Sequence, residues 1–279
     1  MQRLPIYFSI SFLLTLFISS CSSDPSLSPS VQTFDISSQF TGESYQLQVF
    51  RPAESSEDAE LPVVYLLDGY YHFEDVKNML ERDLNDLEVM LVGIFYKDFP
   101  FSLSNLGPIE ELREIDLTYP IHNSSSGAEL GGGGLKFYDF LTKEVDSLIE
   151  ENYKIDAAQR TLMGHSLGGY FTLWQMFNFV DSPFYHNVVS LSPALWWSDV
   201  NILKMHQSAL QENKNHPFKL YVGIGTQEGI EANALVDEFA ERQANSPVPA
   251  LVSTFDRYEG GHLFSAKTGF QKALKNLFP

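Results

Sequence analysis

The chain has 279 residues, of which 44% are hydrophobic and 14% aromatic, so it can bury enough apolar surface to offset the entropy lost on folding as one domain. Asp and Glu number 36 against 18 Lys and Arg, a formal net charge of −18, and this balance repels phosphate backbones and therefore argues against nucleic acid as a partner. The single cysteine excludes an intrachain disulfide and a thiolate cluster for zinc or iron–sulfur.

The first residues have the pattern of an export signal. Met1-Gln-Arg-Leu carries one positive charge and leads into a mostly apolar run over residues 6–18, which is short for a membrane-spanning helix. Ile18-Ser-Ser-Cys21 resembles the lipobox of bacterial lipoproteins, in which the cysteine is acylated. We therefore expect residues 1–20 to be a signal peptide and a lipid on Cys21 to attach the protein to a membrane of the bacterial cell envelope, on a periplasmic or surface face. An ordinary secretory signal followed by an incidental cysteine is the alternative.

The Ser- and Pro-rich segment that follows cannot build a core, so residues 21–34 are expected to be a flexible tether and 35–279 the folded domain. Residues 45–50 alternate as a half-buried strand, whereas 62–67 and 89–95 are near-continuous apolar runs that suit buried parallel strands. Apolar residues recur at helical spacing at about 73–85 and over 135–153.

Four more strands are predicted, each followed by a helix, and the last helix spans about 265–277. These strands cover 161–164, 187–191, 219–224 and 250–255. Alternation of strands and helices predicts an α/β fold with a mostly parallel central sheet and helices on both faces. Ligands of such sheets bind where the carboxyl ends of the strands meet the loops. The stretch 97–134 has no sustained period and contains Gly131-Gly-Gly-Gly134, so we expect a long loop that helps to wall a site, with a disordered insertion as the alternative.

The strongest chemical signal is Gly164-His-Ser-Leu-Gly-Gly169, which matches the G-x-S-x-G pattern. A predicted strand precedes it and a predicted helix follows it, which is the context of a nucleophile elbow. The tight turn forces Ser166 into strained backbone angles and holds its hydroxyl above the sheet. Backbone N–H groups at the start of the following helix favour negative charge at that point. The pattern predicts Ser166 as a nucleophile.

A serine hydroxyl needs a base, and in elbow-bearing sheets the chain order is serine, acid, histidine. His262 follows the last predicted strand in Tyr258-Glu-Gly-Gly-His262 and is the predicted base. Glu228, on the loop after the strand 219–224, is the predicted acid that orients the imidazole. Glu231 and Asp237 are nearby alternatives to Glu228.

An oxyanion hole requires two N–H donors. We expect one from Leu167, directly after the nucleophile, and one from the backbone of Tyr70, on the Asp68-Gly-Tyr loop after the buried run 62–67. The N–H of Gly69 is the alternative second donor.

Four further side chains are candidates for the wall of a substrate site. Tyr71, Trp196 and Trp197 are able to stack on an aromatic or sugar substrate, with core packing as the equal alternative. Arg113, if it faces the cleft, is able to bind an acid group, although a structural salt bridge is the preferred interpretation.

Together these segments resemble one known family over roughly residues 35–279. The resemblance is carried by Pro62–Gly69, Arg113–Thr118, Phe137–Leu141 with Glu144, Arg160–Gly169, Ser192–Trp197 and Gly260–His262. These segments are similar to those of the Putative esterase family of α/β hydrolases, which includes enterobactin esterases, feruloyl and acetylxylan esterases, and S-formylglutathione hydrolase. The resemblance implies an α/β-hydrolase fold and catalytic roles for Ser166 and His262.

The sequence therefore predicts a serine carboxylic-ester hydrolase that acts through an acyl-enzyme on a small ester such as a siderophore or a feruloyl or acetyl sugar. No metal or organic cofactor is implied. Two alternatives stay open, a binding lipoprotein that keeps the fold without turnover and an acyltransferase on the same fold. The sequence makes no prediction of oligomeric state.

Overall fold

The computed structural model describes residues 31–53, 55–56, 58–99, 106–120, 122–123, 129–212 and 217–279. The expected signal peptide and Cys21 lie outside the described residues. In the part of the chain that is described, no helix has the length and apolar character needed to cross a membrane.

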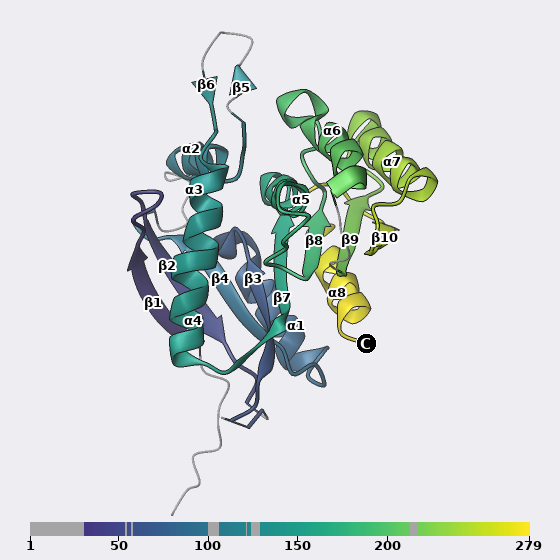
Figure 1. Cartoon of the computed structure of the whole chain (residues 1–279). Helices are drawn as coiled ribbons and strands as arrows, with labels where there is room; N and C mark the ends of the chain where they lie inside the picture. The colour runs from purple at the N-terminus through teal and green to yellow at the C-terminus, as the bar shows by residue number, and fades with distance from the viewer. Residues whose placement is uncertain are drawn as a thin grey trace, which may run out of the picture.

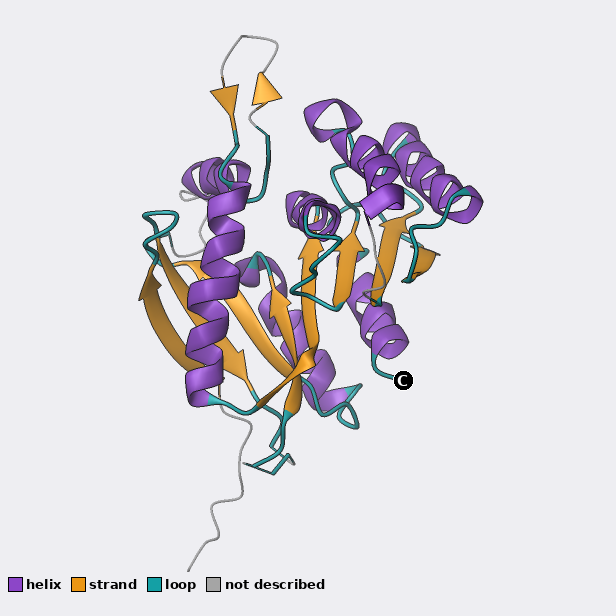
Figure 2. Cartoon of the chain, viewed as in Figure 1, coloured by secondary structure: helices purple, strands orange, loops and turns teal. Residues whose placement is uncertain are grey.

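An eight-stranded sheet forms the centre of the molecule, with the order β1-β2-β4-β3-β7-β8-β9-β10 (Figures 1 and 2). Its strands are β1 (Val31–Ser37), β2 (Ser44–Phe50), β3 (Leu61–Leu66), β4 (Met90–Tyr96), β7 (Ile155–His165), β8 (Asn187–Leu191), β9 (Phe218–Gly225) and β10 (Leu251–Tyr258). β2 is antiparallel to β1 and β4, and the remaining neighbours are parallel. β5 (His122–Asn123) and β6 (Glu129–Leu130) form a separate small hairpin.

Helices cover both faces of the sheet (Figure 2). They are α1 (Gly69–Arg82), α2 (Leu106–Asp116), α3 (Gly134–Asp139), a π-helical turn η2 (Phe140–Val145), α4 (Asp146–Asn152), α5 (Leu167–Asn178), α6 (Trp197–Glu212), α7 (Ile230–Asn245) and α8 (Ala266–Leu277). α1 and α8 pack on one face, where Phe73 and Phe270 join one buried apolar cluster. The continuous α3–η2–α4 segment, α5, α6 and α7 pack on the other. The predicted fold class, a mostly parallel α/β sheet between helices, is confirmed.

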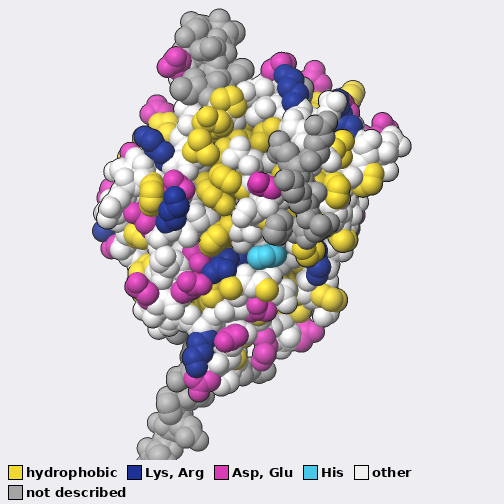
Figure 3. Space-filling model, in the orientation of Figure 1, with side chains coloured by type: hydrophobic (Ala, Val, Ile, Leu, Met, Phe, Trp, Pro, Cys, Tyr) yellow, Lys and Arg dark blue, Asp and Glu magenta, His cyan; other side chains and the backbone are white. Residues whose placement is uncertain are grey.

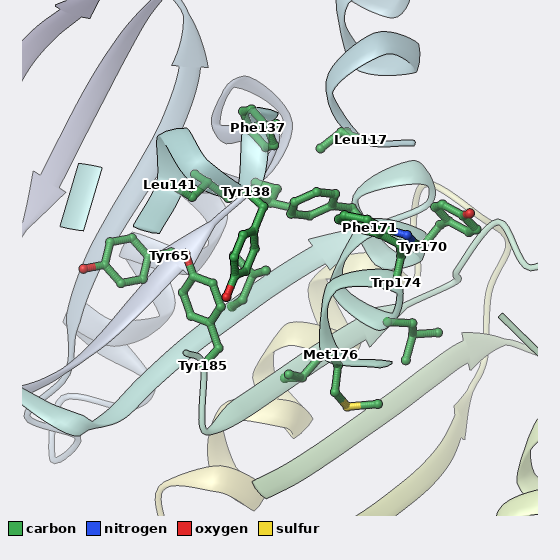
Figure 4. Packing of buried hydrophobic residues seen from close by; sticks show 14 of the residues in the cluster. Tyr65, Leu117, Phe137, Tyr138, Leu141, Tyr170, Phe171, Trp174, Met176 and Tyr185 are labelled. Carbon is green, nitrogen blue, oxygen red and sulfur yellow. The ribbon is translucent and has the colours of Figure 1, made fainter. Parts of the chain in front are cut away.

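The larger core cluster is rich in aromatic rings (Figure 4). Phe137 meets Phe171 edge to face with ring centroids 5.4 Å apart, and Tyr138 stacks on Phe179 at 4.0 Å. These two contacts pack α3 against α5 and the residue that follows it, and aromatic rings bury large areas when they pack in this way. The carboxylates, in contrast, are scattered among basic and apolar side chains on the face that Figure 3 shows, as expected of a solvated acidic surface.

Two boundary predictions were wrong. β1 begins at Val31, so residues 31–34, assigned to the tether, belong to the sheet. β1 is an edge strand, and only its Phe34 and Ile36 pack on the core. Two inward-facing apolar residues are too few to give a recognisable strand alternation in the sequence. The stretch 97–134 is also not one long loop, because residues 106–116 form α2, whose Ile109 is fully buried. A helix with so few buried apolar positions shows little periodicity.

Candidate active site

A sharp bend at Ser166 joins β7 to α5. Ser166 adopts φ 59° and ψ −117°, outside the regions that non-glycine residues prefer. Its N–H donates to Leu191 O at 3.0 Å, and its carbonyl accepts from Ala194 N at 3.1 Å, so the neighbouring strand end holds the bend. Any other residue at position 164 would place its Cβ 2.3 Å from Gly168 O, so only glycine fits there without a clash. The bend has the geometry of a nucleophile elbow.

His262 and Glu228 meet above the carboxyl ends of β9 and β10. His262 Nδ1 lies 2.8 Å from Glu228 Oε2. The Glu228 side chain is 2% exposed and that of His262 is 45% exposed, so a buried carboxylate supports an accessible imidazole. Backbone hydrogen bonds from Thr226 N to Tyr258 O and from Gln227 N to Gly260 O tie the two loops together. This arrangement fixes the ring and leaves Nε2 on the side away from the carboxylate.

The other oxygen of Glu228 is held equally well. Oε1 accepts hydrogen bonds from Ser192 Oγ at 2.6 Å, Gly225 N at 2.7 Å and Ser265 Oγ at 3.3 Å. Burial acts to raise the pKa of Glu228, but the hydrogen bonds to its charged form, led by that from His262, lower the pKa below its ordinary value. The carboxylate is therefore anionic at neutral pH and available to stabilise an imidazolium.

Neither alternative acid occupies this position. Glu231 is an exposed residue in the first turn of α7, and Asp237 accepts a hydrogen bond from Arg257. Ser192, which the sequence analysis did not assign a role, supports Glu228 from a left-handed turn (φ 45°) directly after β8. The sequence signals for Ser192 were its place at the end of a predicted strand and within the Ser192–Trp197 segment of the family resemblance, and neither gave it a role.

Ser166 and His262 line the same cavity, which has a volume of about 680 Å³. Its other walls come from α1, α2, the end of β7, α8 and the loop after His262. The residues are Tyr71, His72, Asp75, Glu110, Arg113, His165, Leu263, Phe264, Ala266, Lys267 and Phe270. Leu263 and Phe264 are largely exposed at this loop. The cavity is therefore lined by apolar, acidic and basic side chains around one hydroxyl and one imidazole. Among the described residues, no group of three or more His, Cys, Asp or Glu has the geometry of a metal site.

The first turns of two helices lie close together beside Ser166. α5 begins at Leu167 and α1 begins at Gly69, directly after Asp68. A Cβ at Gly168 would lie 3.1 Å from Asp68 Oδ2 and 3.5 Å from Leu67 Cβ, so the two helix starts are in contact. N–H groups in a first helical turn have no partner within the helix and carry partial positive charge. The structure thus brings together the helix starts that contain the predicted donors Leu167 and Tyr70.

The predicted wall residues separate into two groups. Tyr71 and Arg113 line the cavity, and Arg113 is paired with Asp68 and Glu110. Trp196 and Trp197 do not line it. Trp197 is the first residue of α6 and is buried in the larger core cluster at 4% exposure, whereas Trp196 is 60% exposed.

A family model described as Putative esterase matches residues 38–278. The chain belongs to the Putative esterase family. It is 25% identical over 266 residues to ferri-bacillibactin esterase BesA of Bacillus subtilis, covering 88% of this chain and 89% of that protein. It is 26% identical over 223 residues to the siderophore enterobactin esterase of Emericella nidulans, covering 71% of each chain.

Solved structures share the fold of this esterase-family chain. The BES protein from Bacillus cereus is similar with a TM-score of 0.79 and 24% identity, covering 90% of this chain and 97% of that one. Siderophore hydrolase EstB from Aspergillus nidulans is similar with a TM-score of 0.76 and 22% identity, covering 90% and 96%. At these identities the likeness shows the α/β-hydrolase-like architecture alone.

Three histidine rings lie in a row along one side of the cavity of this family member. The ring centroid of His165 is 4.5 Å from that of His262 and 5.2 Å from that of His72. His165 Nε2 lies 2.8 Å from His262 O, a geometry in which a neutral imidazole donates to the carbonyl. Burial lowers the pKa of His165 well below its ordinary value and that of His72 to about 4. His165 therefore holds the backbone of His262, a contact that the sequence analysis did not foresee.

The low pKa of His72 predicts a loss of stability on mild acidification. The unfolded chain takes up this proton near pH 6.5, whereas the folded protein does so only near pH 4, so protons favour unfolding between these values. From pH 7 to pH 5, His72 alone should remove about 2 kcal/mol of unfolding free energy. Urea unfolding at pH 7 and pH 5 measures the fall in unfolding free energy between the two pH values. In His72→Gln this fall should be smaller than in the wild type by about 2 kcal/mol. Equal falls in the wild type and in His72→Gln would contradict the lowered pKa of His72.

Proposed function

We propose that this protein is a serine carboxylic-ester hydrolase in which Ser166 is the nucleophile, His262 the general base and Glu228 the acid that orients it. The observation that carries the proposal is the 2.8 Å contact between His262 Nδ1 and the buried carboxylate of Glu228, on a histidine that lines the same cavity as Ser166. A carboxylate on Nδ1 selects the tautomer whose Nε2 is able to accept a proton.

In the proposed reaction, Nε2 of His262 takes the proton of Ser166 while Oγ attacks the ester carbonyl. Glu228 stabilises the imidazolium that forms. The N–H groups of Leu167 and Tyr70, in the first turns of α5 and α1, stabilise the oxyanion. The imidazolium then protonates the leaving alcohol, and water attacks the acyl-enzyme by the same proton transfers to release the acid and regenerate Ser166.

For the substrate we propose a siderophore ester. The support is that two relatives of similar length are named as siderophore esterases, at 25% and 26% identity. The cavity is compatible with this choice, because its volume of about 680 Å³ lies in the range of small-molecule sites. The partly exposed ring of Tyr71 and the exposed ring of Phe264 offer faces for an aromatic arm. A feruloyl or acetyl sugar ester is the other substrate class that such a wall accommodates.

A panel of catecholate-siderophore, feruloyl and acetyl esters, given to the protein without residues 1–21, tests the proposal. We expect hydrolysis to the free acid, fastest for the siderophore ester. Ser166→Ala should lower kcat by about 10⁴-fold or more, because the nucleophile is lost. Ser147→Ala, an exposed serine on α4 whose hydroxyl bonds to Lys143 O, is the matched control and should keep full activity.

Three outcomes would count against parts of this proposal. Hydrolysis that survives in Ser166→Ala would refute the nucleophile. Transfer of the acyl group to an added sugar in preference to water would replace hydrolysis by acyl transfer. A folded protein that binds these esters without turnover would establish the binding lipoprotein instead.

We also propose that a lipid on Cys21 attaches the protein to a membrane of the bacterial envelope. The described domain supports an arrangement in which such an anchor leaves the site accessible. β1 runs in the same direction as β4 and β3, so its first residue, Val31, lies at the amino edge of the sheet. Ser166 follows the carboxyl end of β7, at the opposite edge. An anchored protein would therefore present the cavity away from the bilayer.

Phase partition of the full chain, expressed in a bacterium that acylates lipoproteins, tests the anchor. The wild type should enter the detergent phase, because acyl chains add about 0.8 kcal/mol of transfer free energy per buried CH₂ group. Cys21→Ser should stay in the aqueous phase with unchanged esterase activity. Recovery of the wild type in the aqueous phase would show that Cys21 carries no lipid.

A further inference from the structure

Asp68, at the junction of β3 and α1, combines backbone strain with a buried charge. It is not a glycine, yet it adopts the left-handed conformation with φ 56° and ψ 47°. Asp68 occupies the N-cap position of α1, but its side chain makes no cap hydrogen bond to the helix. Backbone strain of this kind persists only where the surroundings enforce it.

The carboxylate of Asp68 is directed at Arg113 of α2. Arg113 Nε donates to Asp68 Oδ1 at 2.7 Å and Nη2 donates to Oδ2 at 2.9 Å, a two-point contact between side chains that are 8% and 2% exposed. Burial alone would lower the pKa of Arg113, but the adjacent Asp68 and Glu110 charges hold it above its ordinary value. The guanidinium is therefore charged, and a planar fork fixes the orientation of the carboxylate as well as its distance.

The same guanidinium connects back to α1 by a second route. Nη1 of Arg113 donates to Glu110 Oε2 at 2.5 Å, and Glu110 Oε1 accepts the hydroxyl of Tyr71 at 3.0 Å. Tyr71 lies in the first turn of α1, and its ring is 5.7 Å from Arg113 Cζ. Two contacts from α2 therefore hold the start of α1. Arg113 bonds to Asp68, before Gly69 and Tyr70, and Glu110 bonds to Tyr71, after them.

Asp68 also lies beside the first turn of α5. Its Oδ2 would lie 3.1 Å from a Cβ placed on Gly168, so a larger residue there would press on the carboxylate. The position of Asp68 thus sets how closely the start of α1 approaches the start of α5. These are the two helix starts that hold the proposed oxyanion donors.

We propose that Arg113 is a positioning residue of the esterase site, which acts through Asp68 to hold the N–H groups at the start of α1 at the distance that the oxyanion requires. This role rests on the proposed function. It differs from direct recognition of a substrate acid group by Arg113, because the guanidinium already donates to Asp68 and Glu110. A group that acts on the oxyanion affects the transition state more than the bound ester.

The chain contains a matched control for this pair. Arg160 donates from Nε and Nη2 to the two oxygens of Asp146 at 2.8 Å each, and Nη2 also contacts Glu150 at 2.5 Å. The side chains of Arg160 and Asp146 are 11% and 5% exposed. This second arginine fork has the same chemistry and similar burial but does not line the cavity. Its loss should therefore reproduce the structural effect without the kinetic one.

The experiment compares Arg113→Gln with Arg160→Gln in thermal unfolding and in steady-state hydrolysis of one neutral ester. Both variants should lower Tm by roughly 5 to 10 °C, since each leaves a buried carboxylate without its partner. Arg113→Gln should also lower kcat by about 100-fold with KM within about threefold, as loss of an oxyanion donor does. Arg160→Gln should keep kcat within about twofold.

The outcomes separate this role from the proposed function. A wild type without esterase activity would overturn both. If the wild type is active and Arg113→Gln raises KM but keeps kcat, Arg113 is a substrate-binding residue and only the positioning role is overturned. Equal losses of kcat in the two arginine variants would also overturn the positioning role. If Arg113→Gln fails to fold, the isosteric Asp68→Asn, which tolerates the left-handed backbone, should show the same fall in kcat, and unchanged kcat there would contradict the proposal.

Discussion

The hydrogen bond between His262 and the buried carboxylate of Glu228 is the interaction on which the account of this site depends. A charged carboxylate is stable in such a place only if hydrogen bonds replace its water. Glu228 receives them from Gly225, the last residue of β9, and from Ser192, His262 and Ser265, which follow β8 and β10. The parallel sheet is therefore a precondition of the proposed chemistry, because it ends these strands at one edge and allows their loops to share a single anion.

On the opposite side of the cavity, backbone N–H groups provide partial positive charge near Ser166. Two helices begin beside Ser166, and their first-turn N–H groups favour negative charge. The strained conformations of Ser166 and Asp68 are the local consequence of directing two helix starts at one point. Hydrogen bonds from neighbouring segments hold both conformations. Ser166 is bonded to Leu191 and Ala194, and Asp68 is bonded to Arg113. Tertiary contacts thus hold in place the backbone that carries the proposed nucleophile and oxyanion donors.

Much of this organisation could be predicted from the chain. Buried parallel strands are continuous apolar runs, so β3, β4 and β8 were located within a residue or two of their observed bounds. The elbow was predictable because a local pattern, strand, glycine-rich turn and helix, encodes it. Chain order then pointed to His262 and Glu228, which the structure places in contact. The α/β class is confirmed, and the chain belongs to the esterase family that these segments resemble.

What the sequence did not reveal depends on contacts between distant segments. Ser192, Asp68 and His165 lie within segments that the sequence analysis singled out, but no local pattern gave them a role. Each acts through a partner at least 36 positions away in the chain. The Trp196-Trp197 pair was a natural candidate for substrate stacking, but the turn after β8 directs one ring into the core and the other to solvent. Edge strand β1 and helix α2 escaped notice because few of their residues are buried.

The most direct test of the central claim is the rate at which a fluorophosphonate labels Ser166, followed by peptide mass spectrometry. Such a probe reacts only with an activated serine, so the account predicts one adduct, on the peptide that contains Ser166. It also predicts labelling that is about 10²-fold or more slower in Glu228→Gln and unchanged in Glu231→Gln, an exposed acid in the next helix. Equal labelling rates in Glu228→Gln and the wild type, or an adduct on another residue, would contradict it.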